Sequence, residues 1–222
     1  MTVLEWGKVG DHRYETGIDR GVLFPLDGPA VPWSGLTSVT ETIGREVKSY
    51  YLDGIKYIDH DVPGTYSAKL AAFTYPDELE TILGLTEYVP GIFLHDQRSK
   101  LFHLSYRTLI GNDVDGTEYG YKVHIAYNLL AVPNDKTLNS MSDQVSVEPF
   151  EWDISGTPNI MFGLRPTAHI SLDSRKVDAD ILKVVEGLLY GTPYVDVDNP
   201  GTDPGLPSLF SLLTLLDSLA GE

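Results

Sequence analysis

The sequence has no cysteine and no long run of apolar residues. Without cysteine, disulfide bonds, thiolate metal sites and a cysteine nucleophile are excluded. No apolar stretch reaches the roughly 18–20 residues that a membrane-spanning helix needs. The N-terminal residues show neither the basic start nor the apolar run of a signal peptide. We therefore expect a chain that folds in the cytoplasm, does not insert into a membrane and is indifferent to redox conditions.

Basic residues are also scarce. Lys and Arg together number 16 against 32 Asp and Glu, which gives a formal net charge of −16 at pH 7. A protein that reads a DNA or RNA sequence normally presents a basic face to the phosphates, so we expect no such binding. An acidic surface past which nucleic acid slides without sticking remains compatible with this charge.

Local motifs of catalytic and metal sites are missing from the sequence. Its six histidines form neither an HExxH motif nor a close pair. His60 stands between Asp59 and Asp61, but in a strand it would face away from both acids. A calcium loop built on Gly116 would need a bidentate Glu where Lys122 stands. GxSxG, Walker and dinucleotide-binding motifs are absent as well. We therefore expect no catalytic residue, no cofactor and no metal site.

Residues typical of strands and turns are abundant. The chain contains 13 Tyr, 21 Gly and 14 Pro, and short β-rich runs alternate with turn residues. This pattern predicts a mainly β fold, a sandwich or a barrel. The pair Asp53-Gly54 predicts a two-residue hairpin, because both residues tolerate a positive φ. Strict alternation over 121–128 predicts a strand, and the acidic run 111–118 before it predicts a hairpin tip.

Three segments predict helices. A short mid-chain helix is expected within 74–84, where Pro76 suits the first turn and Gly84 the end. A second helix is expected over 178–190, with apolar residues at helical spacing. The segment 208–219 is apolar almost all round and follows a linker rich in Pro, Gly and Asp. It is either a core helix of its own chain or an element that docks on a neighbouring subunit.

Several segments in a fixed order carry a family resemblance. They are residues 6–23, 31–39, 71–79, 105–113, 121–128 and 188–192. Together they make the chain similar to the major tail proteins, the tail tube subunits, of long-tailed actinobacterial bacteriophages. The resemblance spans nearly the whole chain, although each segment alone is a structural and not a catalytic signature.

The resemblance implies a β-sandwich or barrel-like tail tube fold with a short mid-chain helix and C-terminal helices. It places a tail tube domain with an N-terminal arm at 1–195, and a linker with a C-terminal docking segment at 196–222. Subunits of such a protein form stacked, commonly hexameric rings in the virion tail, after assembly in the host cytoplasm. The expected partners are further copies of the chain, other tail proteins at the tube ends, and phage DNA that passes through the lumen at ejection without specific binding.

Two sets of residues are candidates for assembly. Subunit contacts are expected from the early segment and from the leucine-rich end of the chain: Tyr14, Ile18, Val22, Leu23, Phe24, Leu209, Phe210, Leu212, Leu213 and Leu216. Deleting residues 208–222 is accordingly expected to leave a folded subunit that assembles poorly. At the acidic hairpin tip, Asp113, Asp115 and Glu118 are expected either to line the lumen or to pair with Lys or Arg of the next ring.

Other functions are compatible with the same sequence. A receptor-binding or carbohydrate-binding module at a tail tip or head surface would use an exposed aromatic platform, for which Trp6 and Trp33 are the candidates. A connector or tail-terminator protein would form single rings and not tubes. A hydrolase with a site dispersed along the chain would show no local motif.

Overall fold

A computed structural model describes residues 3–44, 46–62, 64–138, 140, 147–161, 163–196 and 200–220. The elements follow one another along the chain as β1 (Tyr14–Pro25), β2 (Val31–Trp33), β3 (Leu36–Ile43), β4 (Glu46–Leu52), β5 (Ile55–Val62), β6 (Tyr66–Ala72), α1 (Glu78–Ile82), β7 (Thr86–Val89), β8 (Ile92–Leu94), β9 (Phe102–Asn112), β10 (Gly116–Pro133), β11 (Phe150–Gly156), β12 (His169–Asp173), α2 (Ala179–Tyr190) and α3 (Leu209–Ala220).

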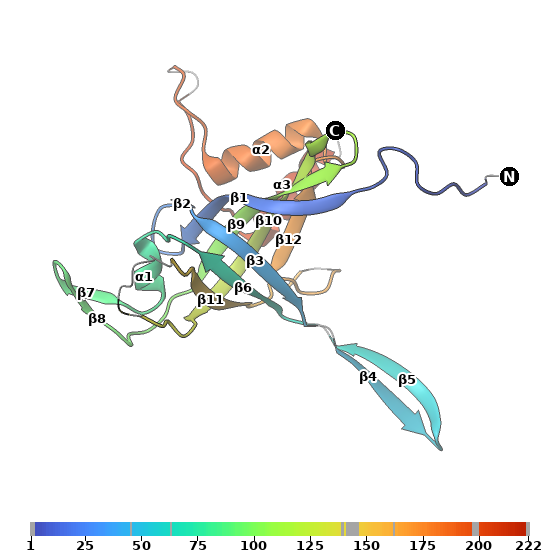
Figure 1. Ribbon diagram of the computed structural model, residues 1–222, viewed down its shortest axis with the longest axis horizontal. Coiled ribbons are helices and arrows are strands. Elements are labelled where there is room, and N and C mark those ends of the chain that lie inside the picture. The colour runs from blue at the N-terminus through green and yellow to red at the C-terminus, as the bar shows by residue number, and fades with distance from the viewer. Residues whose placement is uncertain are drawn as a thin grey trace.

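The strands are antiparallel and the fold is mainly β, which confirms the expected fold class. Eight strands form one sheet in the order β2-β1-β9-β10-β11-β6-β3, with β12 paired to β10. The hairpins β4–β5 and β7–β8 form two separate two-stranded sheets. The body of the molecule is therefore one large sheet, and two small ribbons project from it (Figure 1).

Strand β10 joins the two halves of the large sheet. Its first half pairs with β12 and its last residues pair with β11, while β9 runs along its other side. The change of partner coincides with a bulge, since the register with β9 shifts between Ala126 and Leu129 and Asn128 has a φ of 50°. A bulge bends a strand and increases its twist. The sheet can therefore curve back and pack one face against itself.

The inner core lies on the concave face of this sheet. It is built from aliphatic and aromatic side chains of β1, β6, β9, β10 and β11 together with α1. Its buried members include Leu23, Trp33, Leu70, Leu79, Phe102, Leu104, Tyr106, Leu129, Trp152 and Ile154. The indole N–H of Trp33 donates to the carbonyl of Thr74, which satisfies its one polar group at 2.9 Å.

A second core lies on the opposite face, under α2 and α3. Val123, Ile125 and Tyr127 alternate along β10 and meet the buried face of α2. Helix α2 begins at Asp178, whose side chain accepts from the N–H of Asp180, and it is followed by Gly191 with a φ of 75°. A side-chain acceptor before the first turn and a glycine after the last turn are common ends of a helix. The mid-chain helix is also present, as the single short element α1.

The β4–β5 hairpin extends a longer ribbon. Strands β3 and β6 pair from Leu36 and Ala72 to Ile43 and Tyr66, and β4 and β5 continue the same path outward (Figure 1). The turn at its tip has Asp53 at a φ of 51° and Gly54 at 78°, which confirms the predicted two-residue hairpin.

Among the described residues, none of the helices combines the length and the apolar character needed to cross a membrane.

Candidate functional site: assembly surfaces and a histidine cluster

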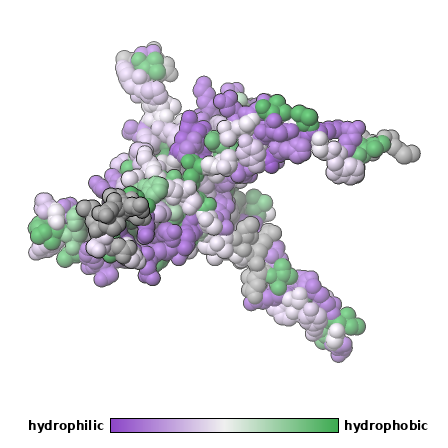
Figure 2. All heavy atoms as spheres, viewed as in Figure 1, coloured by the Kyte–Doolittle hydropathy of each residue, from purple (hydrophilic) through white to green (hydrophobic). Residues whose placement is uncertain are grey.

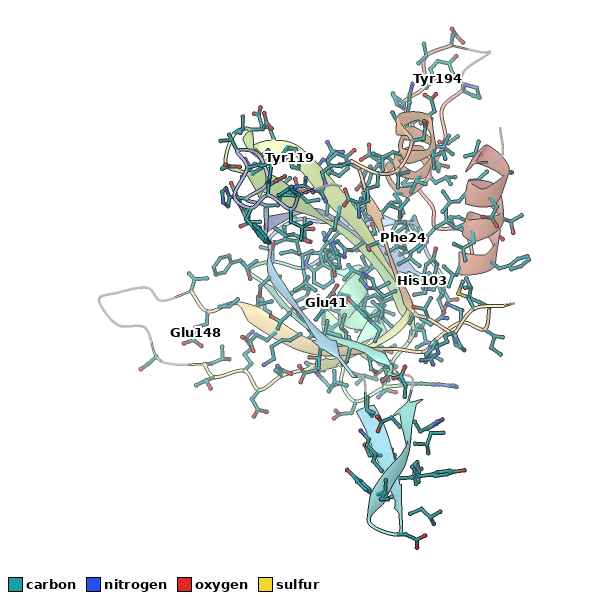
Figure 3. The ribbon with its side chains drawn as sticks, turned by 90° about the vertical axis from the view of Figure 1, so that its right-hand side faces the viewer. Phe24, Glu41, His103, Tyr119, Glu148 and Tyr194 are labelled. Atoms are coloured by element: carbon teal, nitrogen blue, oxygen red, sulfur yellow. The ribbon has the colours of Figure 1, made fainter. Side chains whose placement is uncertain are left out.

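The β4–β5 hairpin exposes apolar side chains on both of its faces. Tyr50 and Tyr51 are neighbours on β4, so they point to opposite sides of the ribbon, and Ile58 on β5 lies opposite Tyr50. Tyr57 is 74% exposed and Ile55, beside the turn, is 72% exposed. Figure 3 shows side chains of the β4–β5 hairpin pointing out on either side of the ribbon. An isolated two-stranded hairpin is marginally stable in water. Exposed apolar side chains on such a hairpin are typical of a surface that another molecule covers.

Two further projecting segments share this character. The β7–β8 hairpin exposes Tyr88, Ile92 and Phe93, and the N-terminal residues expose Leu4 and Trp6. Figure 2 shows apolar residues at the ends of the projections, while the body between them is largely hydrophilic. Three projections of the described chain thus carry exposed apolar side chains: β4–β5, β7–β8 and residues 3–9.

The early segment that the sequence predicted as an interface is split by the structure. Val22, Leu23 and Phe24 are buried inside the subunit, so the expectation that they contact a neighbour needs correction. The reason is that β1 lies between β2 and β9 and is covered on both faces, by the inner core and by the helices. Tyr14 remains exposed and Ile18 half-buried, and their interface role stays a prediction.

Helix α3 is likewise divided between two faces. Leu209 and Leu212 are buried in the core beneath α2, so this face docks on its own subunit. Leu213 and Leu216 are half-buried against the same core. Phe210 points outward and is 65% exposed. Of the five predicted contact residues in this helix, Phe210 is therefore the one fully available to a neighbour.

The acidic hairpin tip is present between β9 and β10, and it is linked to the N-terminal segment. Asp113 accepts from the N–H of Gly10 at 2.9 Å and lies 3.2 Å from the ring nitrogen of His12. The hydrogen bond from His12 holds the pKa of Asp113 below its usual value. Asp115 accepts from the side chain of Asn112 at 3.0 Å, and Glu118 is exposed. Whether these three acids line a lumen stays a prediction.

The fold brings together two histidines that lie far apart in the sequence. His124 on β10 and His169 on β12 lie diagonally across the strand pair, and their Nδ1 and Nε2 atoms are 3.2 Å apart. Glu41 reaches the same point from β3, with its Oε1 3.7 Å from His124 Nδ1 and 3.6 Å from His169 Nε2. These three side chains, the histidine cluster, come from three strands and from both layers of the curved sheet.

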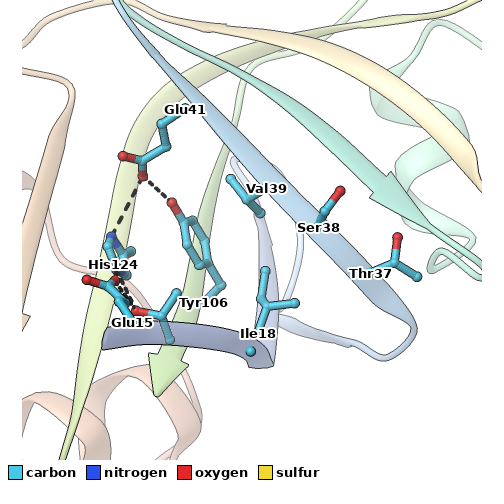
Figure 4. Close-up of a pocket in the computed structure, with 10 residues that line it drawn as sticks. Glu15, Ile18, Thr37, Ser38, Val39, Glu41, Tyr106 and His124 are labelled. Atoms are coloured by element: carbon cyan, nitrogen blue, oxygen red, sulfur yellow. Dashed lines mark hydrogen bonds and ion pairs between the residues drawn. The ribbon is translucent and has the colours of Figure 1, made fainter. Parts of the chain in front are cut away.

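Hydrogen bonds hold Glu41 and His124 of the cluster in place (Figure 4). The hydroxyl of Tyr106 donates to Glu41 Oε1. The hydroxyl of Thr108 donates its hydrogen to Glu15 Oε1 at 2.6 Å. The hydroxyl oxygen of Thr108 is therefore left to accept from Nε2–H of His124 at 3.0 Å. His124 therefore carries its proton on Nε2, and the lone pair of its Nδ1 faces Nε2 of His169 at hydrogen-bond distance.

Burial keeps both rings neutral. Desolvation lowers the pKa of His124 and of His169 below the ordinary histidine value, although the nearby Glu41 acts in the opposite direction. A cavity of about 400 Å³ opens beside the cluster, and Glu15, Glu41, Tyr106, Thr108 and His124 contribute to its lining. A neutral imidazole pair beside a carboxylate, with access from a cavity, is a set of atoms able to bind a metal ion.

The sequence contained part of this signal. His124 falls between Val123 and Ile125, so the alternation already placed it on the face opposite to the helix-covered one. The missing information was the register of β12 on β10 and the approach of β3 from the other layer. Both depend on pairings between segments far apart along the chain.

No protein-family model and no curated protein matches the sequence. Three of the solved structures that match belong to contractile injection systems. A chain of the PVC sheath–tube complex in its extended state is 17% identical, with 69% of this chain and 88% of that chain covered and a TM-score of 0.37. A chain of the anti-feeding prophage tube-terminating cap is 9% identical, with 78% and 97% covered and a TM-score of 0.37. A PVC sheath/tube terminator is 11% identical, with 69% and 93% covered and a TM-score of 0.34. At these TM-scores the likeness is too weak to assign a shared fold or function.

Proposed function

We propose that the protein is a structural subunit of a phage tail tube, which self-assembles into stacked hexameric rings around a lumen that conducts DNA. The observation that carries this proposal is the β4–β5 hairpin with apolar side chains on both faces. Burying a large apolar side chain contributes about 1.5–3 kcal/mol, so a neighbour that covers this ribbon gains substantial binding energy.

The proposed occupant of this surface is a second copy of the chain. A ribbon apolar on both sides fits between two other surfaces, which is the situation of a segment inserted into a ring or between rings. The subunit also offers strand edges, since β2 and β3 end the strand order of the large sheet. Pairing with a neighbour would protect such edges. The exposed β7–β8 hairpin and residues 3–9 supply further apolar surface for contacts between rings.

Sequence and charge support the same proposal. The segments that resemble major tail proteins run from residue 6 to residue 192 and include most strands of the large sheet. A net charge of −16 suits a tube whose wall must not hold DNA phosphates. In this function the protein has no catalytic step, and it acts in the virion tail together with the proteins at the tube ends.

The aromatic platform of the carbohydrate-binding alternative loses one of its two candidates. Trp33 is 2% exposed and packs edge-to-face on Trp152 inside the inner core, so it cannot stack on a sugar. Trp6 is 85% exposed, on the projecting N-terminal segment.

Negative-stain electron microscopy across a concentration series tests the proposal. We expect the wild-type protein to form rings and hollow tubes with a regular axial repeat. The double variant Tyr57→Ser/Ile58→Ser should remain monomeric at the same concentrations, because it removes two exposed apolar side chains from the hairpin. Its unfolding free energy should stay within about 0.5 kcal/mol of wild type, since both side chains are exposed.

A matched control is Val132→Ser, which removes a similarly exposed apolar side chain from β10, in the body of the molecule. This variant should still assemble. Assembly of the hairpin variant at wild-type concentrations would refute the role of β4–β5. If the wild-type protein formed single rings without tubes, it would be a terminator or connector and not a tube subunit.

A further inference from the structure

We propose that Glu41, His124 and His169 bind one divalent transition-metal ion of the zinc type, which fastens β3 to β10 and β12. The ligand atoms are Oε1 of Glu41, Nδ1 of His124 and Nε2 of His169. This site is independent of the proposed assembly, because all three ligands belong to one subunit.

The spacing of the three atoms matches the size of the ion. Their separations are 3.2, 3.7 and 3.6 Å. A point equidistant from all three lies about 2.0 Å from each, within the range of zinc–imidazole and zinc–carboxylate bonds. A triangle of this size is small enough for a single ion to contact every corner.

Partners outside the triangle orient two of the three ligands. The relay from His124 Nε2–H through Thr108 to Glu15 leaves the lone pair of His124 on Nδ1, facing the other two members of the cluster. Such a histidine–acceptor contact fixes the ring and its tautomer in most metal sites. The donor hydroxyl of Tyr106 restrains Glu41 Oε1, which keeps a second lone pair for the ion.

Charge and access also favour a cation. Burial disfavours the charged form of both imidazoles. The carboxylate of Glu41 lies beside Nδ1 of His124, and that of Glu15 lies beside its Nε2. The adjacent cavity gives an entry path, and it leaves room for a water molecule as a further ligand of the ion. Three protein ligands of the His₂Glu type plus water make a complete tetrahedral zinc site.

The consequence of binding is mechanical. Glu41 lies on β3, the last strand of the sheet, whereas His124 and His169 lie on β10 and β12. An ion at this point would cross-link the two layers of the curved sheet near its open end. Metal binding to the folded state alone raises stability by mass action.

The test is calorimetric titration of the full chain with Zn²⁺ after dialysis against a chelator, combined with the visible spectrum of the Co²⁺ form. We expect one ion per chain, a tetrahedral Co²⁺ spectrum and a higher thermal midpoint with zinc. The variants Glu41→Gln and His169→Gln should each weaken zinc binding at least about tenfold, and Thr108→Val, which leaves all ligands intact, should weaken it by about 10–100-fold. Far-ultraviolet circular dichroism checks that each variant is folded, and Glu41→Gln is a mild change because that side chain is 35% exposed.

His60→Gln is the matched control, since His60 lies between two acids on β5 and outside the cluster. Its zinc binding should equal that of wild type. Absence of stoichiometric binding to the wild-type chain, or equal binding by Glu41→Gln and His169→Gln, would overturn the proposal. Loss of binding in His60→Gln with retention in the cluster variants would move the site to the hairpin and overturn it as well.

Discussion

His103 holds the bulge of β10 in place. Its Nδ1 accepts from the backbone N–H of Asn128 at 2.9 Å, at the residue whose φ of 50° marks the bulge. A protonated ring could not accept this hydrogen bond. Burial lowers the pKa of His103 below the ordinary value, so the ring is neutral in the folded protein. The shape of the sheet at the change of partner from β12 to β11 therefore depends on one neutral imidazole.

This pKa shift predicts a pH dependence of stability. Above about pH 6.5 the ring is neutral in both the folded and the unfolded chain, so the stabilisation is complete. As the pH falls below that value, the unfolded chain binds a proton that the folded chain does not, and the free energy of unfolding decreases. Urea unfolding at pH 7.5 and pH 5.5 should show a smaller decrease for His103→Gln than for wild type. His95 is exposed, so His95→Gln should retain the wild-type decrease. An equal decrease in the free energy of unfolding for all three proteins would contradict the role given to His103.

At the level of residues, the sequence predicts local backbone conformation better than contacts between distant residues. It correctly marked the left-handed pair Asp53 and Gly54, because the physical cause is local. It missed the meeting of His124, His169 and Glu41, because no local pattern reports which strands become neighbours. It also assigned Val22 and Phe24 to an interface, since an apolar residue in a strand looks the same whether its cover is a neighbour or the helices of its own chain.

Among the elements, α3 shows most clearly the difference between side chains that stabilise the fold and side chains available for assembly. Leu212 is 1% exposed in the core under α2, and Phe210 on the opposite face is 65% exposed. We expect Leu212→Ala to lower the unfolding free energy of the monomer by about 2–5 kcal/mol. Phe210→Ser should change it by less than about 0.5 kcal/mol and instead reduce assembly. Chemical denaturation and sedimentation velocity measure the two effects.

The same comparison revises the expected effect of deleting residues 208–222. Because Leu209 and Leu212 are buried in the core beneath α2, the shortened chain would expose part of that core and lose stability before any question of assembly arises. Phe210→Ser is therefore the informative variant. If it forms tubes as readily as wild type, α3 serves its own subunit alone.

Elements with strong local signals were predictable and their arrangement was not. The alternation over 121–127 and the helical spacing over 178–190 correspond to β10 and α2. The bounds of the helix within 74–84 were too wide, because Pro76 and Asp77 form the preceding turn and only Glu78–Ile82 are α-helical. The pairing of β11 with β6 joins segments separated by most of the chain's middle, and nothing local to either strand specifies it.

On the scale of the whole molecule, charge opposes association. Each chain carries a formal charge of −16, so copies in a ring repel one another unless salt screens them. The screening length falls from about 10 Å at 0.1 M salt to about 3 Å at 1 M. We expect light scattering to show faster and more extensive assembly as sodium chloride rises over this range. The opposite trend would mean that ion pairs between subunits dominate, as they would if the tip acids Asp113 and Asp115 paired with Lys or Arg of the next ring.

The continuity of β3–β6 with the β4–β5 hairpin also determines how the subunit would respond to tension. Pulling on the hairpin loads β3 and β6 along their length, and β6 is joined to β11 by seven register pairs from Tyr66 and Gly156 to Ala72 and Phe150. Inter-strand hydrogen bonds lie perpendicular to that pull, so they are sheared together and are not opened one after another. A tube built from such ribbons would stretch little and break abruptly, and a single-molecule extension experiment on the subunit would show one high-force event at this seam.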